Sequence, residues 1–204
     1  MCSQHKNHWE NVYKTKNENE VSWFQETPHK SIDLIKSINI DFSSNIIDVG
    51  AGDSRLVDNL LLLGFKNITV LDISSKSIEK AKIRLGEKSD LISWVVSDIN
   101  EFKSEKKFDL WHDRAAFHFL RSTKKIKSYV KLVNELINNQ GTLIISTFSK
   151  NGPLKCSGLE VSQYDRKGIS ELFKNFKLNK SEIYIHKTPF NTNQEFIYNV
   201  LSKN

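Results

Sequence analysis

The stretch I-I-D-V-G-A-G-D-S-R-L, residues 46–56, decides the fold of this chain. An apolar run ends in an acid and is followed by two glycines before polar residues open a helix. This pattern is typical of a strand that turns into a ligand-binding loop. Gly50 and Gly52 have no Cβ atom, so the backbone can approach a ligand closely there. The dinucleotide fingerprint needs a third glycine at position 55, and Arg55 stands there instead, which disfavours a pyrophosphate cofactor.

Two further acids follow apolar runs later in the chain. Asp72 closes the run Ile68 to Leu71 and lies about 20 positions after Gly52, near the spacing at which an acid binds ribose hydroxyls. Asp98 follows the run Leu91 to Val96. The two glycines together with Asp72 as a ribose acid predict an adenosine-containing ligand.

These motifs resemble those of the class I S-adenosylmethionine-dependent methyltransferases, and the resemblance covers most of the chain. It is carried by Asp48-Val49-Gly50-Ala51-Gly52, by Asp72-Ile73-Ser74 and by Ser97-Asp98-Ile99. It implies that Asp48 and the glycines hold the methionine part of the cofactor, that Asp72 holds the ribose and that Asp98 reaches the adenine amino group. S-adenosylhomocysteine would be the product. With a cap from the N-terminal segment, the predicted cofactor-binding residues are Trp23, Asp48, Gly50, Ala51, Gly52, Asp72, Ile73, Ser97, Asp98 and Ile99.

Two other stretches narrow the resemblance. Trp111-His112-Asp113-Arg114-Ala115 and Cys156-Ser157-Gly158-Leu159 resemble a group of small bacterial methyltransferases often labelled type 11 or 12. The segment Trp23-Phe24 resembles that of thiol methyltransferases, and the family resemblance implies that an N-terminal aromatic segment folds over the bound cofactor. Core packing is the alternative reading of these two aromatic residues.

Alternation of strand and helix patterns predicts an α/β fold with a parallel sheet. The resemblance implies a single-domain, Rossmann-like seven-stranded sheet in the order 3-2-1-4-5-7-6, with the last strand antiparallel and helices on both faces. We expect a lid or helical extension over residues 1–30 and the methyltransferase domain over residues 31–204. Thr27 is predicted to cap a helix that starts at Pro28. Helices are predicted over 54–63, 75–85, 124–137 and 165–173, and strands over 46–49, 68–71, 91–96, 108–112, 142–147, 178–186 and 194–200.

Composition restricts the class of protein. The chain has 204 residues, a net charge of +6 and 38% hydrophobic residues, which fits one globular domain. Its lysines are spread along the chain, so a solvated basic surface is favoured over nucleic-acid binding. Cys2 and Cys156 are too few for a disulfide framework. We expect a cytoplasmic monomer or homodimer with no membrane span, no signal peptide and no metal.

The end of the fourth predicted strand is where we expect the chemistry, because it neighbours the first strand at the cofactor crevice. His112, Asp113 and Arg114 are therefore the candidate catalytic residues, although Asp113 and Arg114 could instead form a local ion pair. The irregular stretch 149–164 is predicted to form a wall of the substrate pocket. His118 is more often a packed histidine than a base. The candidate substrate-binding residues are Phe24, Phe117, His118, Cys156 and Tyr164.

The function predicted from these residues is methyl transfer to a small-molecule acceptor. A thiol or hydrosulfide is favoured, because a positive Arg114 stabilises an anion and opposes a cationic ammonium group. Protein lysine methylation is the alternative, since Asp113-Arg114-Ala115 also resembles an element of seven-strand lysine methyltransferases. A non-catalytic module that binds S-adenosylmethionine is the alternative from another class.

Overall fold

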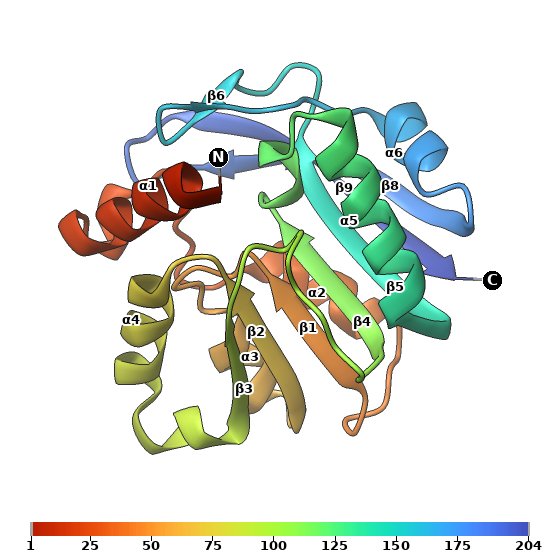
Figure 1. The fold of residues 1–204 in the computed structure, drawn as a ribbon, viewed down its shortest axis with the longest axis horizontal. Helices are drawn as coiled ribbons and strands as arrows, with labels where there is room; N and C mark the ends of the chain where they lie inside the picture. Colours follow the sequence, from red (N-terminus) through yellow and green to blue (C-terminus); the bar gives the residue numbers. More distant parts are fainter. Residues whose placement is uncertain (1, 204) are drawn as a thin grey trace.

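The computed structural model describes residues 2–203, with side chains from residue 4 onward; Met1, Asn204 and the side chains of Cys2 and Ser3 lie outside the described part. Within it, a seven-stranded sheet has the order β3-β2-β1-β4-β5-β9-β8 (Figure 1). β9 runs antiparallel to both neighbours. The predicted fold class and strand order are confirmed. The strands are β1 (Asn45–Val49), β2 (Asn67–Asp72), β3 (Ile92–Val96), β4 (Phe108–Arg114), β5 (Ile137–Phe148), β8 (Phe176–Lys187) and β9 (Asn193–Lys203).

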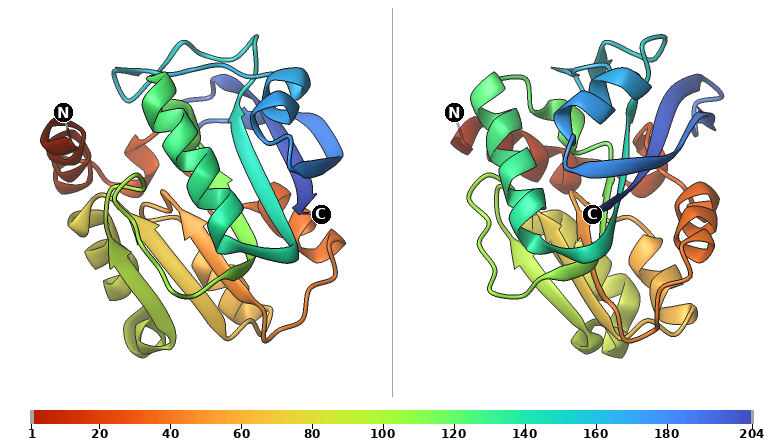
Figure 2. Two further views of the ribbon diagram at one scale, coloured as in Figure 1. Left: turned by 45° about the vertical axis from the view of Figure 1, so that its right-hand side comes forward. Right: turned by 90° about the vertical axis from the view of Figure 1, so that its right-hand side faces the viewer.

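Helices cover both faces of the sheet (Figure 2). α2 (His29–Ser37) and α3 (Leu56–Leu62) lie on one face, and α5 (Thr123–Leu136) and α6 (Arg166–Leu172) lie on the other. Each face has its own apolar core, because the central strands are buried on both sides. α4 (Ser75–Leu85) lies beside α3, and α1 (Cys2–Thr15) contacts α4 near the carboxyl ends of β1 and β2 (Figure 1).

Local capping explains several helix starts. The Ser74 hydroxyl accepts a hydrogen bond from the Ser77 backbone at the start of α4, and the Asp165 carboxylate accepts one from Gly168 at the start of α6. The prediction that Thr27 caps the next helix is wrong. Pro28 is the N-cap residue of α2 and makes no side-chain cap bond, while the Thr27 carbonyl accepts from the His29 backbone.

The boundary between α5 and β5 also differs from the prediction. β5 begins at Ile137, with no turn between the helix and the strand. Gln140, predicted to lie in a turn with Gly141, is inside the strand with φ +67°. The pairing of β4 with β5 shifts register between Phe108 and Leu110, whose partners are Ile137 and Thr142. Gln140 and Gly141 therefore lie in an irregular part of β5.

The stretch 149–164 contains a short hairpin that sequence patterns did not show. β6 (Lys155–Cys156) pairs with β7 (Leu159–Glu160), and the turn between them has positive φ at Ser157 and Gly158. Positive φ at both turn residues matches the right-handed twist of the paired strands. The remaining helical segments are η1 (Glu18–Glu20), η2 (Gly86–Leu91) and η3 (Phe117–Phe119). In residues 2–203, no helix combines the length and apolar character needed to cross a membrane.

A buried polar network ties β4 to α5. The Tyr129 hydroxyl donates to the Asp113 carboxylate at 2.6 Å and accepts from the Trp111 indole at 3.0 Å. The backbone N–H groups of Ala116 and Phe117 donate to the other carboxylate oxygen. Burial raises the pKa of Asp113 to about 6 despite these bonds. A buried carboxylate needs such partners, because leaving one unsatisfied costs its full desolvation penalty.

Tyr129→Phe is expected to destabilise the protein by about 2 kcal/mol, because it removes a bond to Asp113 and leaves the Trp111 N–H without an acceptor. Urea denaturation followed by circular dichroism measures this change. Tyr198→Phe is the matched control, since Tyr198 is equally buried but its hydroxyl has no hydrogen-bond partner in the described structure. Equal unfolding free energies for the two variants would contradict the role assigned to Tyr129.

Candidate functional site

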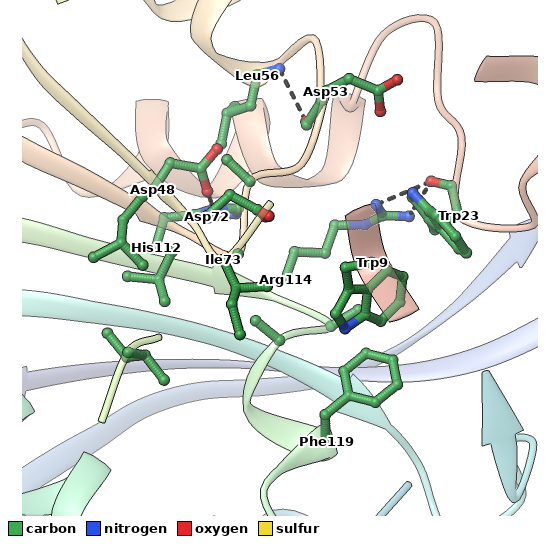
Figure 3. Close-up of a pocket in the computed structure, with 18 of the residues that line it drawn as sticks. Trp9, Trp23, Asp48, Asp53, Leu56, Asp72, Ile73, His112, Arg114 and Phe119 are labelled. Carbon is green, nitrogen blue, oxygen red and sulfur yellow. Dashed lines mark hydrogen bonds and ion pairs between the residues drawn. The ribbon is translucent and has the colours of Figure 1, made fainter. Parts of the chain in front are cut away.

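A pocket lies at the carboxyl ends of β1, β2 and β4 and is bounded on its open side by α1 (Figure 3). Its floor comes from the loop after β1, and its walls come from the ends of the neighbouring strands and from the segment between α1 and α2. Parallel strands place their carboxyl ends, and the loops that follow, at this one edge. Of the predicted cofactor residues, the pocket brings together Trp23, Asp48, Gly50, Ala51, Asp72, Ile73, Ser97, Asp98 and Ile99.

The glycine loop is held against the end of β2. The backbone N–H groups of Gly50 and Ala51 donate to the Leu71 carbonyl at 2.8 and 3.2 Å. Gly50 and Gly52 have φ near +60°, which favours glycine. A Cβ on Gly50 would lie 2.2 Å from the Ala116 Cβ, and one on Gly52 would lie 2.1 Å from the Tyr13 hydroxyl. The loop therefore packs too closely for side chains at both positions.

Asp72 is fixed by backbone donors on both sides of its carboxylate. One oxygen accepts from the Gly52 N–H and the other from the Ser74 N–H, each at 2.8 Å. Burial raises the pKa of Asp72 to about 6, and the two backbone bonds only partly offset that effect. Asp53 lies in the same pocket and adds to the rise. A carboxylate with a raised pKa in a pocket is a typical feature of a ligand-binding site.

His112 is engaged by two buried partners. Its Nδ1 lies 2.7 Å from the Asp48 carboxylate, and its Nε2 lies 2.9 Å from the Ser31 hydroxyl (Figure 3). The ring is 2% exposed. With both nitrogens occupied, His112 orients Asp48 at the end of β1 and joins α2 to the sheet. The predicted candidate catalytic residue His112 thus lies at the pocket with both ring nitrogens engaged by protein groups.

Arg114 points from the end of β4 toward Trp23 (Figure 3). Both terminal guanidinium nitrogens donate to the Trp23 carbonyl at 3.1 Å, and Nε is buried without a hydrogen-bond partner. The guanidinium carbon lies 5.5 Å from the centre of the Phe196 ring. Among residues 2–203 no acid forms an ion pair with Arg114, so its positive charge is balanced only by dipoles and an aromatic face.

This positive charge acts on neighbouring groups. Burial and then Arg114 lower the pKa of His118 to about 3 and that of His186 to about 4, although a bond to the Ser22 carbonyl raises the latter. Cys156 also lines the pocket, and burial raises its pKa to about 11 although Arg114 acts in the opposite direction. A buried neutral thiol therefore stays protonated beside Arg114.

Aromatic side chains from separate segments close the pocket on the α1 side. The Trp9 ring of α1 lies 5.6 Å from the Trp23 ring and 5.1 Å from the Phe119 ring, both in edge-to-face geometry. Figure 3 shows Trp9 between Phe119 and the Arg114–Trp23 pair. Phe24 also lines the pocket, and the Arg55 guanidinium lies 5.8 Å from its ring centre.

Gly52 does not line the pocket, and four of the predicted catalytic and substrate-binding residues also lie outside it. Asp113 is fully buried with its carboxylate bound to Tyr129, which corrects its predicted catalytic role. Phe117 and Tyr164 stack on each other in the core beside α5, with ring centres 5.2 Å apart. His118 is buried, and its Nδ1 accepts from the Phe148 N–H. Asp113, Phe117, His118 and Tyr164 belong to segments that border the pocket, but their side chains are buried in the core instead of lining it.

Sequence reasoning also missed part of the pocket. Lys125 lies 4.0 Å from the Asp98 carboxylate at the start of α5, and Ser31 reaches His112 from α2. Neither residue belongs to a motif, so no pattern in the sequence pointed to this side of the site. No group of three or more histidine, cysteine or acidic residues in the described part could hold a metal ion. The missed lining residues include His5, Tyr13, Pro28, Ser31, Arg55, Phe119 and Lys125.

Comparison with known proteins places the chain in a family. A family model described as "Methyltransferase domain" matches residues 40–201. Malonyl-[acyl-carrier protein] O-methyltransferase 2 of Ilyobacter polytropus is 29% identical over 52% of this chain and 40% of its own length. Ubiquinone biosynthesis O-methyltransferase of Rickettsia canadensis is 28% identical over 75% of this chain and 64% of its own length. The chain therefore matches only part of these relatives.

A solved structure shows the same fold. The N-methyltransferase NodS from Bradyrhizobium japonicum, in complex with S-adenosylhomocysteine, has a TM-score of 0.69 and 14% identity, covering 96% of this chain and 98% of NodS. The family match spans more than half of the chain and includes the glycine loop and the acids that end β1 and β2. The chain belongs to the methyltransferase domain family, within the class I S-adenosylmethionine-dependent methyltransferases.

Proposed function

We propose that this protein transfers the methyl group of S-adenosylmethionine to a small, soft, anionic acceptor, with a thiol or hydrosulfide favoured. The observation that carries the proposal is Arg114, whose guanidinium lines the pocket without an acidic partner. A cation in a partly dry pocket favours the negative form of whatever binds beside it. Aromatic walls from Trp9, Trp23 and Phe119 suit an acceptor with little polar surface.

The pocket residues fit the cofactor. The Gly52 and Ser74 backbone donors only partly offset the burial of the Asp72 carboxylate, so further hydrogen bonds from ribose hydroxyls would stabilise it. Asp48 lies at the end of β1 beside the glycine loop, where it would face the methionine part. Ile73 and Ile99 line the pocket near Asp98 and would provide apolar contacts for the adenine.

The arrangement explains why an ionised acceptor is favoured. The sulfonium group of the cofactor supplies a methyl group that is already activated for transfer. The chain must then align the acceptor and keep water out. The titratable side chains next to Arg114 are engaged elsewhere, since His112 binds Asp48, Asp113 binds Tyr129 and His118 is buried. A thiol, with a pKa of ~8.5 in solution, needs only modest help to ionise, and the positive charge of Arg114 would supply it.

The alternatives are weaker on the same evidence. Lysine methylation depended on Asp113, which is buried in the core, and the free charge of Arg114 would repel an ammonium group. The names of the relatives point to O-methylation and N-methylation of different substrates, so they do not favour one acceptor atom. A non-catalytic binding module would hold the cofactor without forming S-adenosylhomocysteine.

We also propose that residues 5–25 form a lid over the cofactor. His5, Trp9 and Tyr13 line the pocket from α1, and Trp23 and Phe24 line it from the segment that follows. The Tyr13 hydroxyl lies above Gly52, close to the ribose acid Asp72. A segment that contributes these walls excludes water once the ligand is bound.

Asp72→Ala is expected to weaken binding of S-adenosylhomocysteine about tenfold or more, because losing charge-assisted bonds to the ribose costs roughly 1.5–3 kcal/mol. Isothermal titration calorimetry measures the affinity. Asp33→Ala, which removes an exposed acid on α2, is the control and should change nothing. An unchanged affinity in Asp72→Ala would show that the ribose assignment is wrong.

The same carboxylate predicts a pH dependence. Ribose donors bind the ionised form, so bound ligand lowers the Asp72 pKa from its value of about 6. The affinity for S-adenosylhomocysteine should therefore be highest above about pH 6, the Asp72 pKa, and should fall as the pH drops below this value. Asp72→Asn should reduce this dependence, and equal affinities at about pH 7.5 and about pH 5 in the wild type would contradict it.

Hydrogen exchange tests the lid. Amides of residues 5–25 should become more protected when S-adenosylhomocysteine binds, because closure then gains the ligand contacts of Trp9 and Trp23. Exchange in α6, which contributes no residue to the pocket, provides the internal control. Equal protection with and without ligand would leave Trp23 as an ordinary core residue.

Assays with sulfide, methanethiol and an aryl thiol test the acceptor. Arg114→Gln should lower kcat/KM for these acceptors about tenfold or more, and Arg114→Lys should keep part of the activity because it keeps the charge. Affinity for S-adenosylhomocysteine is measured in parallel. An unchanged affinity shows that the substitution lowered activity through the acceptor and not by disturbing the lid. Labelled methyl groups that enter a protein band from lysate, with no small thioether formed, would overturn the thiol proposal.

A further inference from the structure

Glu10 on α1 makes an unusually complete set of contacts with the start of α4. One carboxylate oxygen accepts from the Ser75 N–H at 2.8 Å and from the Ser75 hydroxyl at 2.9 Å. The other accepts from the Ser74 hydroxyl at 2.8 Å and from the Lys76 N–H at 3.0 Å. Glu10 thus joins two helices whose contacting residues lie more than sixty positions apart in the chain.

The chemistry of a helix start explains why a carboxylate binds there. The first N–H groups of α4 have no partner inside the helix, and the helix dipole places partial positive charge at this end. Glu10 satisfies two of these groups with a negative charge. Partial burial raises the pKa of Glu10, but the bonds from Lys76, Ser75 and Ser74 outweigh it and hold the pKa below its usual value. The contact therefore favours the ionised side chain.

Ser74 connects this contact to the cofactor site. Its hydroxyl donates to Glu10, while its backbone N–H donates to the Asp72 carboxylate. The same hydroxyl accepts from the Ser77 N–H as the N-cap of α4. Ser74 thus hydrogen-bonds both to Asp72, the predicted ribose acid, and to Glu10 of α1. Glu10 itself does not line the pocket, whereas its neighbours Trp9 and Tyr13 do.

We propose that Glu10 is a positioning residue, which holds α1 closed over the cofactor pocket by capping α4. The proposal rests on the lid described above and adds the contact that fixes it. Because Glu10 acts through Trp9 and Tyr13, its loss lowers the fraction of molecules with a closed pocket. The apparent dissociation constant for the cofactor rises as that fraction falls. By reciprocity, bound cofactor strengthens the contact between Glu10 and α4.

The experiment compares Glu10→Ala, Glu10→Gln and Glu10→Lys with the wild type. Glu79→Gln is the matched control, because it removes a carboxylate from α4 that pairs only with Lys76 on the surface. Calorimetry measures the affinity for S-adenosylhomocysteine, and hydrogen exchange measures the protection of α1. Neither readout requires an acceptor or turnover. Thermal unfolding shows whether each variant is folded.

Glu10→Ala should raise the dissociation constant about tenfold and abolish the protection of α1, while Glu10→Gln should have a smaller effect because it keeps an acceptor. Glu10→Lys should have the largest effect, since it places a positive charge at the α4 start. KM for the cofactor should rise more than kcat falls at saturating cofactor. Glu79→Gln should match the wild type.

The outcomes separate this inference from the proposed function. Unchanged affinity and unchanged α1 protection in Glu10→Ala and Glu10→Lys would overturn the inference and leave cofactor binding intact. Wild-type protein that fails to bind S-adenosylhomocysteine would instead overturn the proposed function. An equal loss of affinity in Glu79→Gln would show that only the charge of α4 matters, which also overturns the role of Glu10.

Discussion

The site depends on the hydrogen bonds that join the glycine loop after β1 to the end of β2. The Leu71 carbonyl receives the N–H groups of Gly50 and Ala51, and the Asp72 carboxylate receives that of Gly52. These bonds set the left-handed backbone of both glycines and fix the direction of the Asp72 side chain. Since adjacent parallel strands carry both partners, the geometry of the cofactor site follows directly from the strand order.

Electrostatics then divides the pocket into two parts. The part beside β1 and β2 carries the acids Asp48 and Asp72, which suit hydroxyl and ammonium donors of the cofactor. The part beside the end of β4 carries Arg114, held against the Trp23 carbonyl and the Phe196 ring. Trp9 of α1 and Phe119 of η3 line the same pocket as this cation. An anionic acceptor bound here would neutralise the positive charge of Arg114.

The sequence predicted the sheet and the cofactor edge well, because both follow from strongly local patterns. The predicted strand order is confirmed, and it brings the glycine loop and the acids that end β1 and β2 to one edge of the sheet. Grouping His112, Asp113 and Arg114 at one crevice overlooked the alternation along β4, which turns neighbouring side chains to opposite faces of the sheet. Asp113 points into the core toward Tyr129, while the adjacent Arg114 points into the pocket. Glu10 was missed because its partners on α4 are distant in sequence.

The most direct test of this account is a crystal structure of the protein with S-adenosylhomocysteine. The account predicts ribose hydroxyls on the Asp72 carboxylate, the adenine beside Asp98, and α1 closed over the ligand with Glu10 on the start of α4. A ligand bound away from Asp72, or bound with α1 released from α4, would contradict it.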